Sequence, residues 1–353
     1  MSESGDVWQG KDTSPDEVAT ALRELLKQSH ADSEAFVPAR VLNLVVIVDR
    51  DWRGEIQNRL DKVGRYHASR TILVSVEEGR TTIDASAAMT AEEELERGEL
   101  AVAQEHVVLD VGPKHMKALD TIVDPLVVSD LATLLWSPHG HHDGVDAMQQ
   151  LAQVILIDSV QADDPPHAVR RSSELAERHY VVDLAWLRST PWRERVASTF
   201  DPGQWRRDLS SISSVTVRHK PDSAMAGLLL LGWLSSRLGW EPGPMTEHDG
   251  GAQGKAKAHK HEIKLALEPD DTMTAPGLAG ITVRSATGMS ISLDRGPGGL
   301  TARRVTTDGE ERTWTVTGAS RGESGILGEG IRQALLRDHT YGPALAATQK
   351  MIA

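Results

Sequence analysis

The sequence contains no cysteine. This absence excludes disulfide bonds, thiolate nucleophiles, cysteine-ligated zinc and thiol redox switching together. Long apolar runs are also missing, because the longest, Ala224 to Leu234, has 11 residues and is too short to span a bilayer. The first residues, Met1 to Trp8, are polar and acidic, so we expect no signal peptide. These features predict a cytoplasmic protein without a membrane segment.

Positive charge is in short supply. The chain has 38 Lys and Arg residues against 51 Asp and Glu residues, which gives a formal net charge of -13. Nucleic acids and anionic membrane surfaces are polyanions, so this balance argues against both as partners of the whole chain.

Motifs of cofactor and nucleophilic chemistry are absent as well. No G-x-G-x-x-G follows the first predicted strand, and no P-loop is present. Gly318 to Gly322 has the G-x-S-x-G spacing, but it follows a predicted antiparallel strand and lacks the strand–turn–helix context of a nucleophile elbow. These motifs therefore identify no catalytic residue and no cofactor site.

Strands and helices alternate in the first half of the chain. Ser14, Pro15 and Glu17 form a helix start signal. Buried strands are then predicted at 41–48, 70–76, 106–111, 131–136 and 154–157, with helices at 53–63, 113–120 and 145–153 between them. This alternation predicts a mostly parallel sheet in a three-layer arrangement. Thr81 to Met89 could extend that sheet as an edge strand.

The second half has a different pattern. An apolar helix is predicted over Ser223 to Leu238, and short alternating strands follow at 263–267, 281–284, 289–293, 300–305 and 314–317. These strands predict an antiparallel meander, which a helix from Ile326 to Arg337 would close. Glu247 to His261 has no apolar anchor and is predicted to be a mobile loop. The fold class is therefore α/β, with an α/β domain over 1–170 and an α+β domain over 171–353.

Two polar segments of the first half could bind small ligands. Gly112 and Lys114 flank a proline where a strand passes into a helix, and helix-start N–H groups with a lysine can hold a phosphate. An ordinary turn is the alternative. His139 to Asp143 is rich in histidine but lacks the i, i+4 spacing of a helical metal site, so we predict no metal. The acidic run from Glu92 to Glu99 is interpreted as a solvated helix or turn.

Tryptophan and arginine gather at two places. Trp136 stands at the carboxyl end of a predicted strand, where open α/β sheets place their working surface. The segment from Asp183 to Arg193, with Trp186, Arg188 and Trp192, has the composition of protein-interface hot spots. The alternative is that the tryptophans pack the joint between the two domains while the arginines pair with local acids.

These segments together resemble the OpcA family, the glucose-6-phosphate dehydrogenase assembly proteins of actinobacteria and cyanobacteria. The resemblance extends over about Arg40 to Arg337 and is sharpest between Val123 and Val196. It is carried by the strings VLNLVVIV, RTILVSV, HVVLDV, LATLLWSP and, above all, DLAWLRSTPWRERV.

The resemblance implies a non-catalytic partner of glucose-6-phosphate dehydrogenase in the oxidative pentose phosphate pathway, which supplies NADPH. It implies an activator whose mechanism is conformational, since the thiol control associated with cyanobacterial relatives cannot operate without cysteine. Partner contact is expected at Asp183, Trp186, Arg188, Trp192 and Arg193, together with Trp136. Two alternatives remain, a sugar-phosphate-binding sensor and a small-molecule transferase, both using the first domain.

Overall fold

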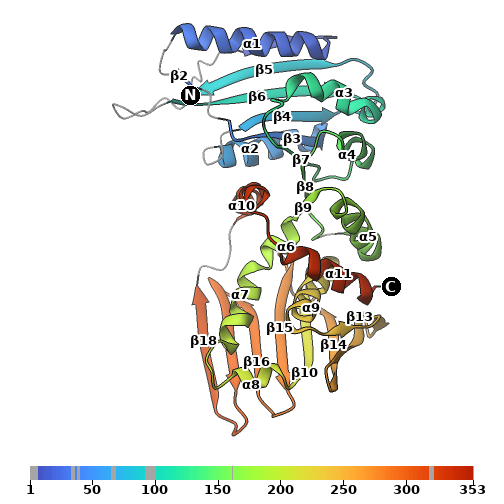
Figure 1. The fold of residues 1–353 in the computed structure, drawn as a ribbon, viewed down its shortest axis with the longest axis vertical. Coiled ribbons are helices and arrows are strands. Elements are labelled where there is room, and N and C mark those ends of the chain that lie inside the picture. The colour runs from blue at the N-terminus through green and yellow to red at the C-terminus, as the bar shows by residue number, and fades with distance from the viewer. Residues whose placement is uncertain are drawn as a thin grey trace. The chain divides into compact units, whose positions relative to one another are not determined.

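A computed structural model describes residues 7–32, 36–37, 40–64, 69–91, 101–160, 162–317 and 322–352. The chain divides into two compact units (Figure 1). Unit 1 comprises residues 1–157, 179–182 and 323–335, and unit 2 comprises residues 158–178, 183–322 and 336–353. The expected boundary at residue 170 falls inside helix α5 (Pro165–Ala176), which belongs to unit 2.

Unit 1 is built on a largely parallel sheet, as the sequence predicts. Its strands lie in the order β1-β5-β6-β4-β3-β7-β8-β9, and a short strand β2 pairs with β6. Their bounds are β1 (Val7–Gly10), β2 (Phe36–Val37), β3 (Leu42–Asp49), β4 (Ser69–Val76), β5 (Asp84–Ala91), β6 (Ala101–Val111), β7 (Thr133–Trp136), β8 (Val154–Ile157) and β9 (Tyr180–Asp183).

The parallel part of this sheet is doubly wound. The chain starts at β3, passes outward through β4 to β6, and then returns to the other side of β3 through β7 and β8. Every residue of β3 from Leu42 to Val48 is buried, which explains the unbroken apolar run in the sequence. The direction of winding reverses between β3 and β7, and the carboxyl ends of these strands form the topological switch point.

Among the predicted helices of unit 1, the one at 53–63 is confirmed, whereas the one at 113–120 is mostly a 3₁₀ turn and the one at 145–153 instead spans His142–Met148. Helix α1 starts with the expected capping box, in which the N–H of Ser14 donates to Glu17 Oε2 at 2.8 Å. The helices are α1 (Pro15–Asp32), α2 (Arg53–Gly64), α3 (Leu119–Val123), α4 (His142–Met148) and α10 (Glu323–Leu336), with short 3₁₀ turns η1 (Arg50–Trp52), η2 (Pro113–Ala118) and η3 (Asp124–Leu126).

The structure corrects two expectations for unit 1. Strand β5 is not an edge strand, because it lies between β1 and β6 and runs antiparallel to both. Helix α10 does not close the second sheet but belongs to unit 1, where Gly328 faces Val63 of α2 and Glu323 lies 3.8 Å from Arg59. The acidic run from Glu92 to Glu99 lies outside the described residues.

Unit 2 has a second, mostly antiparallel sheet in the order β11-β13-β14-β10-β15-β16-β17-β18. The last four strands form the predicted meander, but β14 pairs parallel with β10, so the sheet is mixed. The bounds are β10 (Ile212–His219), β11 (Glu241–Pro242), β12 (Thr246–His248), β13 (Gly251–Ala258), β14 (His261–Pro269), β15 (Leu278–Ser285), β16 (Ser290–Gly296), β17 (Gly299–Val305) and β18 (Glu311–Thr317).

The predicted mobile loop over Glu247 to His261 is wrong, because most of it forms β12 and β13. Backbone pairing with β14 orders this segment in place of an apolar anchor. A Cβ at Gly251 would lie 2.1 Å from the carbonyl oxygen of Leu267, so only glycine permits this close approach. The glycine that favoured a loop in the sequence is therefore required for the close pairing of β13 with β14.

The helices of unit 2 are α5, α6 (Leu184–Arg188), α7 (Thr190–Phe200), α8 (Arg206–Leu209), α9 (Ala224–Leu238) and α11 (Tyr341–Met351). Helix α9 is the predicted central helix and is buried from Met225 to Ser235. Helix α11 packs closely on it, since a Cβ at Gly232 would lie 2.2 Å from Thr348 Oγ1. Across the described ranges of both units, no helix has the length and apolarity needed to cross a bilayer.

Candidate functional site

Asp183 stands at the centre of a buried polar cluster in unit 2. It precedes α6, and its Oδ1 accepts the N–H of Ala185 at 2.9 Å, so it caps the helix. Its Oδ2 accepts the hydroxyl of Ser159 at 2.6 Å and that of Tyr341 at 3.3 Å. The side chain therefore ties α6 to α11 and to the segment that precedes α5.

Burial controls the charge of this cluster. It raises the pKa of Asp183 to about 6, and the neighbouring Asp158 carboxylate adds to this increase. Burial also raises the pKa of the Tyr341 phenol well above its usual value, with Asp183 as the next cause. The tyrosine is thus a neutral hydrogen-bond donor at physiological pH.

Trp186 and Arg193 form the second half of this cluster. The Trp186 indole N–H donates to Asp338 Oδ2 at 2.7 Å, and its ring meets the Tyr341 ring edge-on at 5.6 Å. The guanidinium carbon of Arg193 lies 3.6 Å from the centre of the Trp186 ring. Arg193 also donates to the Trp186 carbonyl and to Thr190 Oγ1, and burial lowers its pKa to about 10.

The remaining predicted partner residues are also mostly enclosed. Arg188 makes a bidentate pair with Asp158 at 2.7 and 2.8 Å. Trp192 is buried in α7, and Trp136 is buried at the end of β7 in unit 1. The structure brings Asp183, Trp186 and Arg193 together, but it places their side chains in the interior of unit 2. Their contacts hold α6, α7 and α11 in place.

The predicted phosphate turn is occupied by the protein itself. The N–H of Gly112 donates to His115 Nδ1 at 3.0 Å, and a Cβ at Gly112 would lie 1.8 Å from the Arg80 carbonyl oxygen. The glycine is needed for this close approach of two backbones. Lys114 is exposed at the start of η2 and forms no ion pair with any residue that the structure describes.

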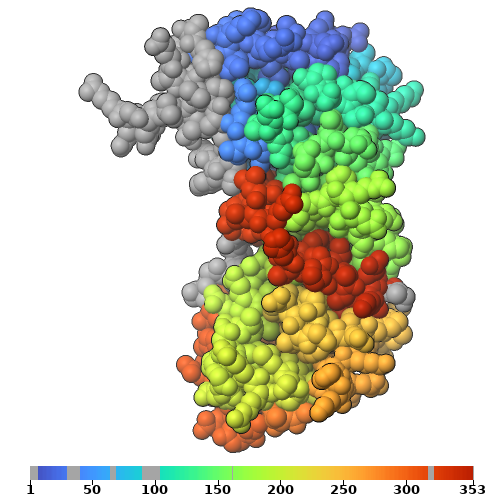
Figure 2. Space-filling view, in the orientation of Figure 1, coloured from blue at the N-terminus to red at the C-terminus, as the bar shows by residue number. Residues whose placement is uncertain are grey.

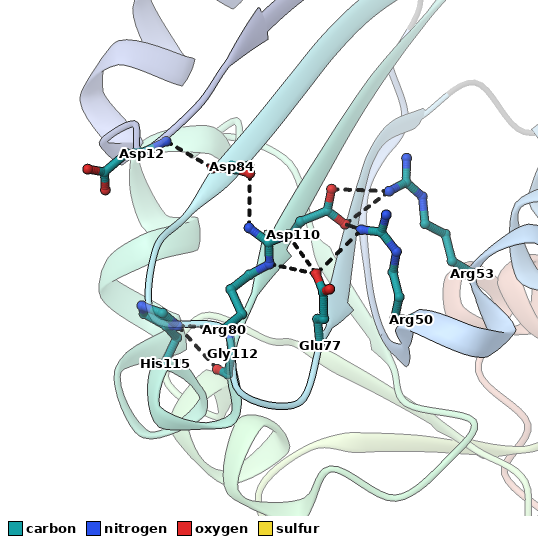
Figure 3. A network of polar contacts seen from close by, with 9 residues as sticks. All are labelled: Asp12, Arg50, Arg53, Glu77, Arg80, Asp84, Asp110, Gly112 and His115. Atoms are coloured by element: carbon teal, nitrogen blue, oxygen red, sulfur yellow. Dashed lines mark hydrogen bonds and ion pairs between the residues drawn. The ribbon is translucent and has the colours of Figure 1, made fainter.

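The carboxyl edge of the unit 1 sheet carries a network of charged side chains (Figure 3). Asp110, near the end of β6, accepts from Arg50 at 2.7 Å and from Arg53 at 2.9 Å. Arg80 joins Glu77 at 2.6 Å to Asp84 at 2.9 Å. Opposite charges therefore alternate along the ends of β4, β5 and β6.

Hydrogen bonds stabilise the charged forms of Arg80 and Asp84 in this network. The hydrogen bond to Glu77 raises the pKa of the Arg80 guanidinium. The backbone N–H of Asp12, followed by the Arg80 side chain, lowers the pKa of Asp84. Arg80 and Asp84 therefore stay ionised across the physiological pH range.

An exposed aromatic side chain lies beside the network, at the switch point. Trp52 is 48% exposed on η1, and its ring contacts that of His139 at a tilt of 32°, with the centroids 5.2 Å apart. Burial lowers the pKa of His139, so its ring is neutral at physiological pH. We name Arg50, Trp52, Arg53, Glu77, Asp110 and His139 the carboxyl-edge patch.

The turn after β3 differs from a dinucleotide-binding turn in charge. Its sequence is Asp49-Arg50-Asp51-Trp52-Arg53-Gly54, so carboxylates stand at the first two glycine positions of a G-x-G-x-x-G spacing. A pyrophosphate approaches the backbone at these positions. Two negative side chains there would repel it.

Sequence reasoning did not single out the carboxyl-edge patch. The pattern Arg-x-Trp-Arg directly after the buried strand β3 could have predicted it. The segment after Asp183, which was predicted to contact a partner, has the same combination of tryptophan and arginine. Among the residues whose positions are described, no group of three or more His, Asp or Glu side chains could hold a metal ion.

Comparison with protein families gives two matches that together span most of the chain. Residues 60–174 match the glucose-6-phosphate dehydrogenase subunit N-terminal domain, and residues 179–345 match the corresponding C-terminal domain.

Curated relatives point the same way. A Synechococcus elongatus protein with the provisional name OxPP cycle protein OpcA is 30% identical over 51% of this chain and 40% of its own length. The protein of that name in Nostoc punctiforme is 27% identical over 39% of this chain and 30% of its own length. The chain thus aligns with less than half the length of these relatives.

Among solved structures, apo scyllo-inositol dehydrogenase from Lactobacillus casei aligns with 89% of this chain and 96% of its own, at 10% identity and a TM-score of 0.46. This likeness is too low to establish a shared fold.

Proposed function

The chain belongs to the OpcA family of glucose-6-phosphate dehydrogenase assembly proteins, and we propose that it is a non-catalytic cytoplasmic subunit that binds this dehydrogenase and activates it. The observation that carries the proposal is the pair of family matches, one in each half of the chain. An activator of this enzyme would control entry into the oxidative pentose phosphate pathway and the supply of NADPH.

The carboxyl-edge patch is the contact surface that we assign to the dehydrogenase. It combines an exposed tryptophan with two arginines and two carboxylates, and such tryptophan and arginine side chains carry most of the binding energy of protein interfaces. The alternating charges fix the register of a partner with complementary charges. Trp52, held against the ring of His139, supplies a preformed apolar anchor.

The predicted residues after Asp183 have an indirect role in this proposal. Trp186, Trp192 and Arg193 are buried, so a partner would reach little of their surface. They set the position of α7, whose exposed residues Glu194, Ala197 and Ser198 are available to the dehydrogenase. Substitutions there would act on the partner through the shape of unit 2.

Activation requires unequal binding to two states of the enzyme. A partner shifts a conformational equilibrium only by the difference between its affinities for the two states. Without cysteine, that difference arises from contacts rather than from a thiol switch. The carboxylates of the turn after β3 disfavour a bound dinucleotide, which supports a regulatory rather than a catalytic role for unit 1.

Steady-state kinetics of the dehydrogenase from the same organism test this function. With increasing amounts of the protein, we expect a saturable fall in the KM for glucose 6-phosphate or a saturable rise in kcat. The protein alone should not reduce the nicotinamide cofactor when given glucose 6-phosphate. Unchanged kinetics together with no co-elution on gel filtration would contradict the proposal.

A further inference from the structure

A small cavity lies in unit 2 between α7 and the last three strands of the sheet. Its volume is about 150 Å³, and its lining includes Arg195, Thr199, Leu293, Arg304 and Trp314. In Figure 2 the yellow-green atoms of α7 and α8 cover much of this part of the sheet, and orange atoms of the strands show at their margin. The cavity is therefore enclosed by a helix on one side and by strands on the other.

The strand register explains why these side chains meet. Leu293 of β16 stands opposite Ala302 of β17, which stands opposite Trp314 of β18. Arg304 lies two residues beyond Ala302, so it is on the same face of the sheet. Arg195 reaches this face from α7 above it.

Both arginines of the cavity have polar atoms without a partner. The Nε atoms of Arg195 and Arg304 are buried and have no hydrogen-bond acceptor within the described chain. Neither guanidinium forms an ion pair with any described residue. Arg303, the neighbour of Arg304 on the opposite face, instead pairs with Glu311 at 2.6 Å. In a chain with a net charge of -13, two partly enclosed cations without a carboxylate are unexpected.

Aromatic rings hold Arg304 in place. Its guanidinium carbon lies 4.3 Å from the centre of the Trp205 ring and 5.8 Å from that of Trp314. Stacking uses the faces of the guanidinium plane and leaves the N–H groups at its edge free to donate. The hydroxyls of Ser198 and Thr199 donate to the Arg195 carbonyl, so the two guanidinium groups are the donors that a ligand would meet.

We propose that this cavity binds the phosphate group of a small metabolite. Two guanidinium groups match the charge of a phosphate dianion and the arrangement of its oxygens. The volume is about that of five water molecules in the liquid, which suits a phosphate group and little more. The rest of such a metabolite would extend past Pro202 toward solvent, since this residue is an exposed part of the lining.

Calorimetric titration of the full chain with inorganic phosphate tests the proposal, with sodium chloride at matched ionic strength as the reference. We expect saturable binding of phosphate that Arg195→Gln and Arg304→Gln each weaken by about tenfold or more. Arg303→Gln is the matched control and should bind as the wild type does, because its side chain lies on the opposite face. The assay contains no dehydrogenase, so its result is independent of that partner.

Circular dichroism of each variant separates loss of binding from loss of folding. If Arg304→Gln unfolds because its stacking on Trp205 is lost, Arg195→Gln still decides the question. Titration with acetate distinguishes the two oxyanion classes, and we expect it to bind at least tenfold more weakly than phosphate. The proposal is overturned by no saturable phosphate binding, by equal binding of acetate, or by unchanged binding in a folded Arg195→Gln variant.

Discussion

Tryptophan and arginine meet in each of the two units, but under opposite conditions. In unit 2 Trp186 is 1% exposed and lies under Arg193, whereas in unit 1 Trp52 is 48% exposed beside Arg50 and Arg53. The composition of the two segments is nearly the same, and only the structure shows which one faces solvent. Similar residues therefore hold helices together in one unit and form an available surface in the other.

Replacing each of the two tryptophans should affect the free energy of unfolding very differently. Trp186→Ala removes a buried ring and leaves Asp338 without its indole donor, so it should lower the free energy of unfolding by about 3–5 kcal/mol. Trp52→Ala should lower it by about 1.5 kcal/mol, because about half of this residue is already exposed to solvent. Urea denaturation measures both values, and equal losses would contradict the contrast.

Asp183 gives a pH test of the buried cluster. Its pKa of about 6 in the folded protein exceeds the ordinary value of 3.8, so between pH 4 and 6 the folded state binds a proton that the unfolded state has lost. The contribution of this group to stability is thus fully present below pH 4 and is lost as the pH rises to about 6, by roughly 3 kcal/mol.

The measurement is the unfolding free energy of the wild type and of Asp183→Asn at several pH values from 4 to 7. The variant has no titrating group at this position, so the difference between the two proteins should change across that window. A difference that is independent of pH would show that Asp183 titrates normally.

The carboxyl-edge network should be the least costly to disrupt. Asp110→Asn removes the charge that Arg50 and Arg53 share, and we expect it to cost about 1 kcal/mol, because all three side chains retain contact with solvent. The loss should shrink as salt is added, since screening weakens such pairs. Thermal unfolding at low and high salt measures this loss. Arg332→Gln, which breaks the exposed ion pair of Arg332 with Glu329 on α10, is the comparison for an isolated surface pair.

Much of the fold could be predicted because its signals are local. The continuous apolar run of β3 and the capping box of α1 determine those elements without distant contacts. Strand β13 could not be predicted in this way, since its sequence Gly251–Ala258 has no apolar alternation and its order comes from backbone pairing with β14. The place of α10 in unit 1 likewise depends on Val63, more than 250 residues earlier.

The site was harder to predict for a related reason. Sequence composition identified Trp186 and Arg193 as neighbours, and the structure does bring them together. It could not show that α11 would cover them, because Asp338 and Tyr341 come from the other end of the chain. The residues around Trp52 were passed over because their charges converge only when β4 and β6 are placed side by side.

We propose that the dehydrogenase binds through the carboxyl-edge patch of unit 1. The most direct test is calorimetric titration of the dehydrogenase with the wild type, with Trp52→Ala and with Val7→Ala, a control that alters another exposed apolar side chain of unit 1. We predict that Trp52→Ala weakens binding by about tenfold or more while Val7→Ala binds as the wild type does. Equal affinities for all three proteins would contradict the claim.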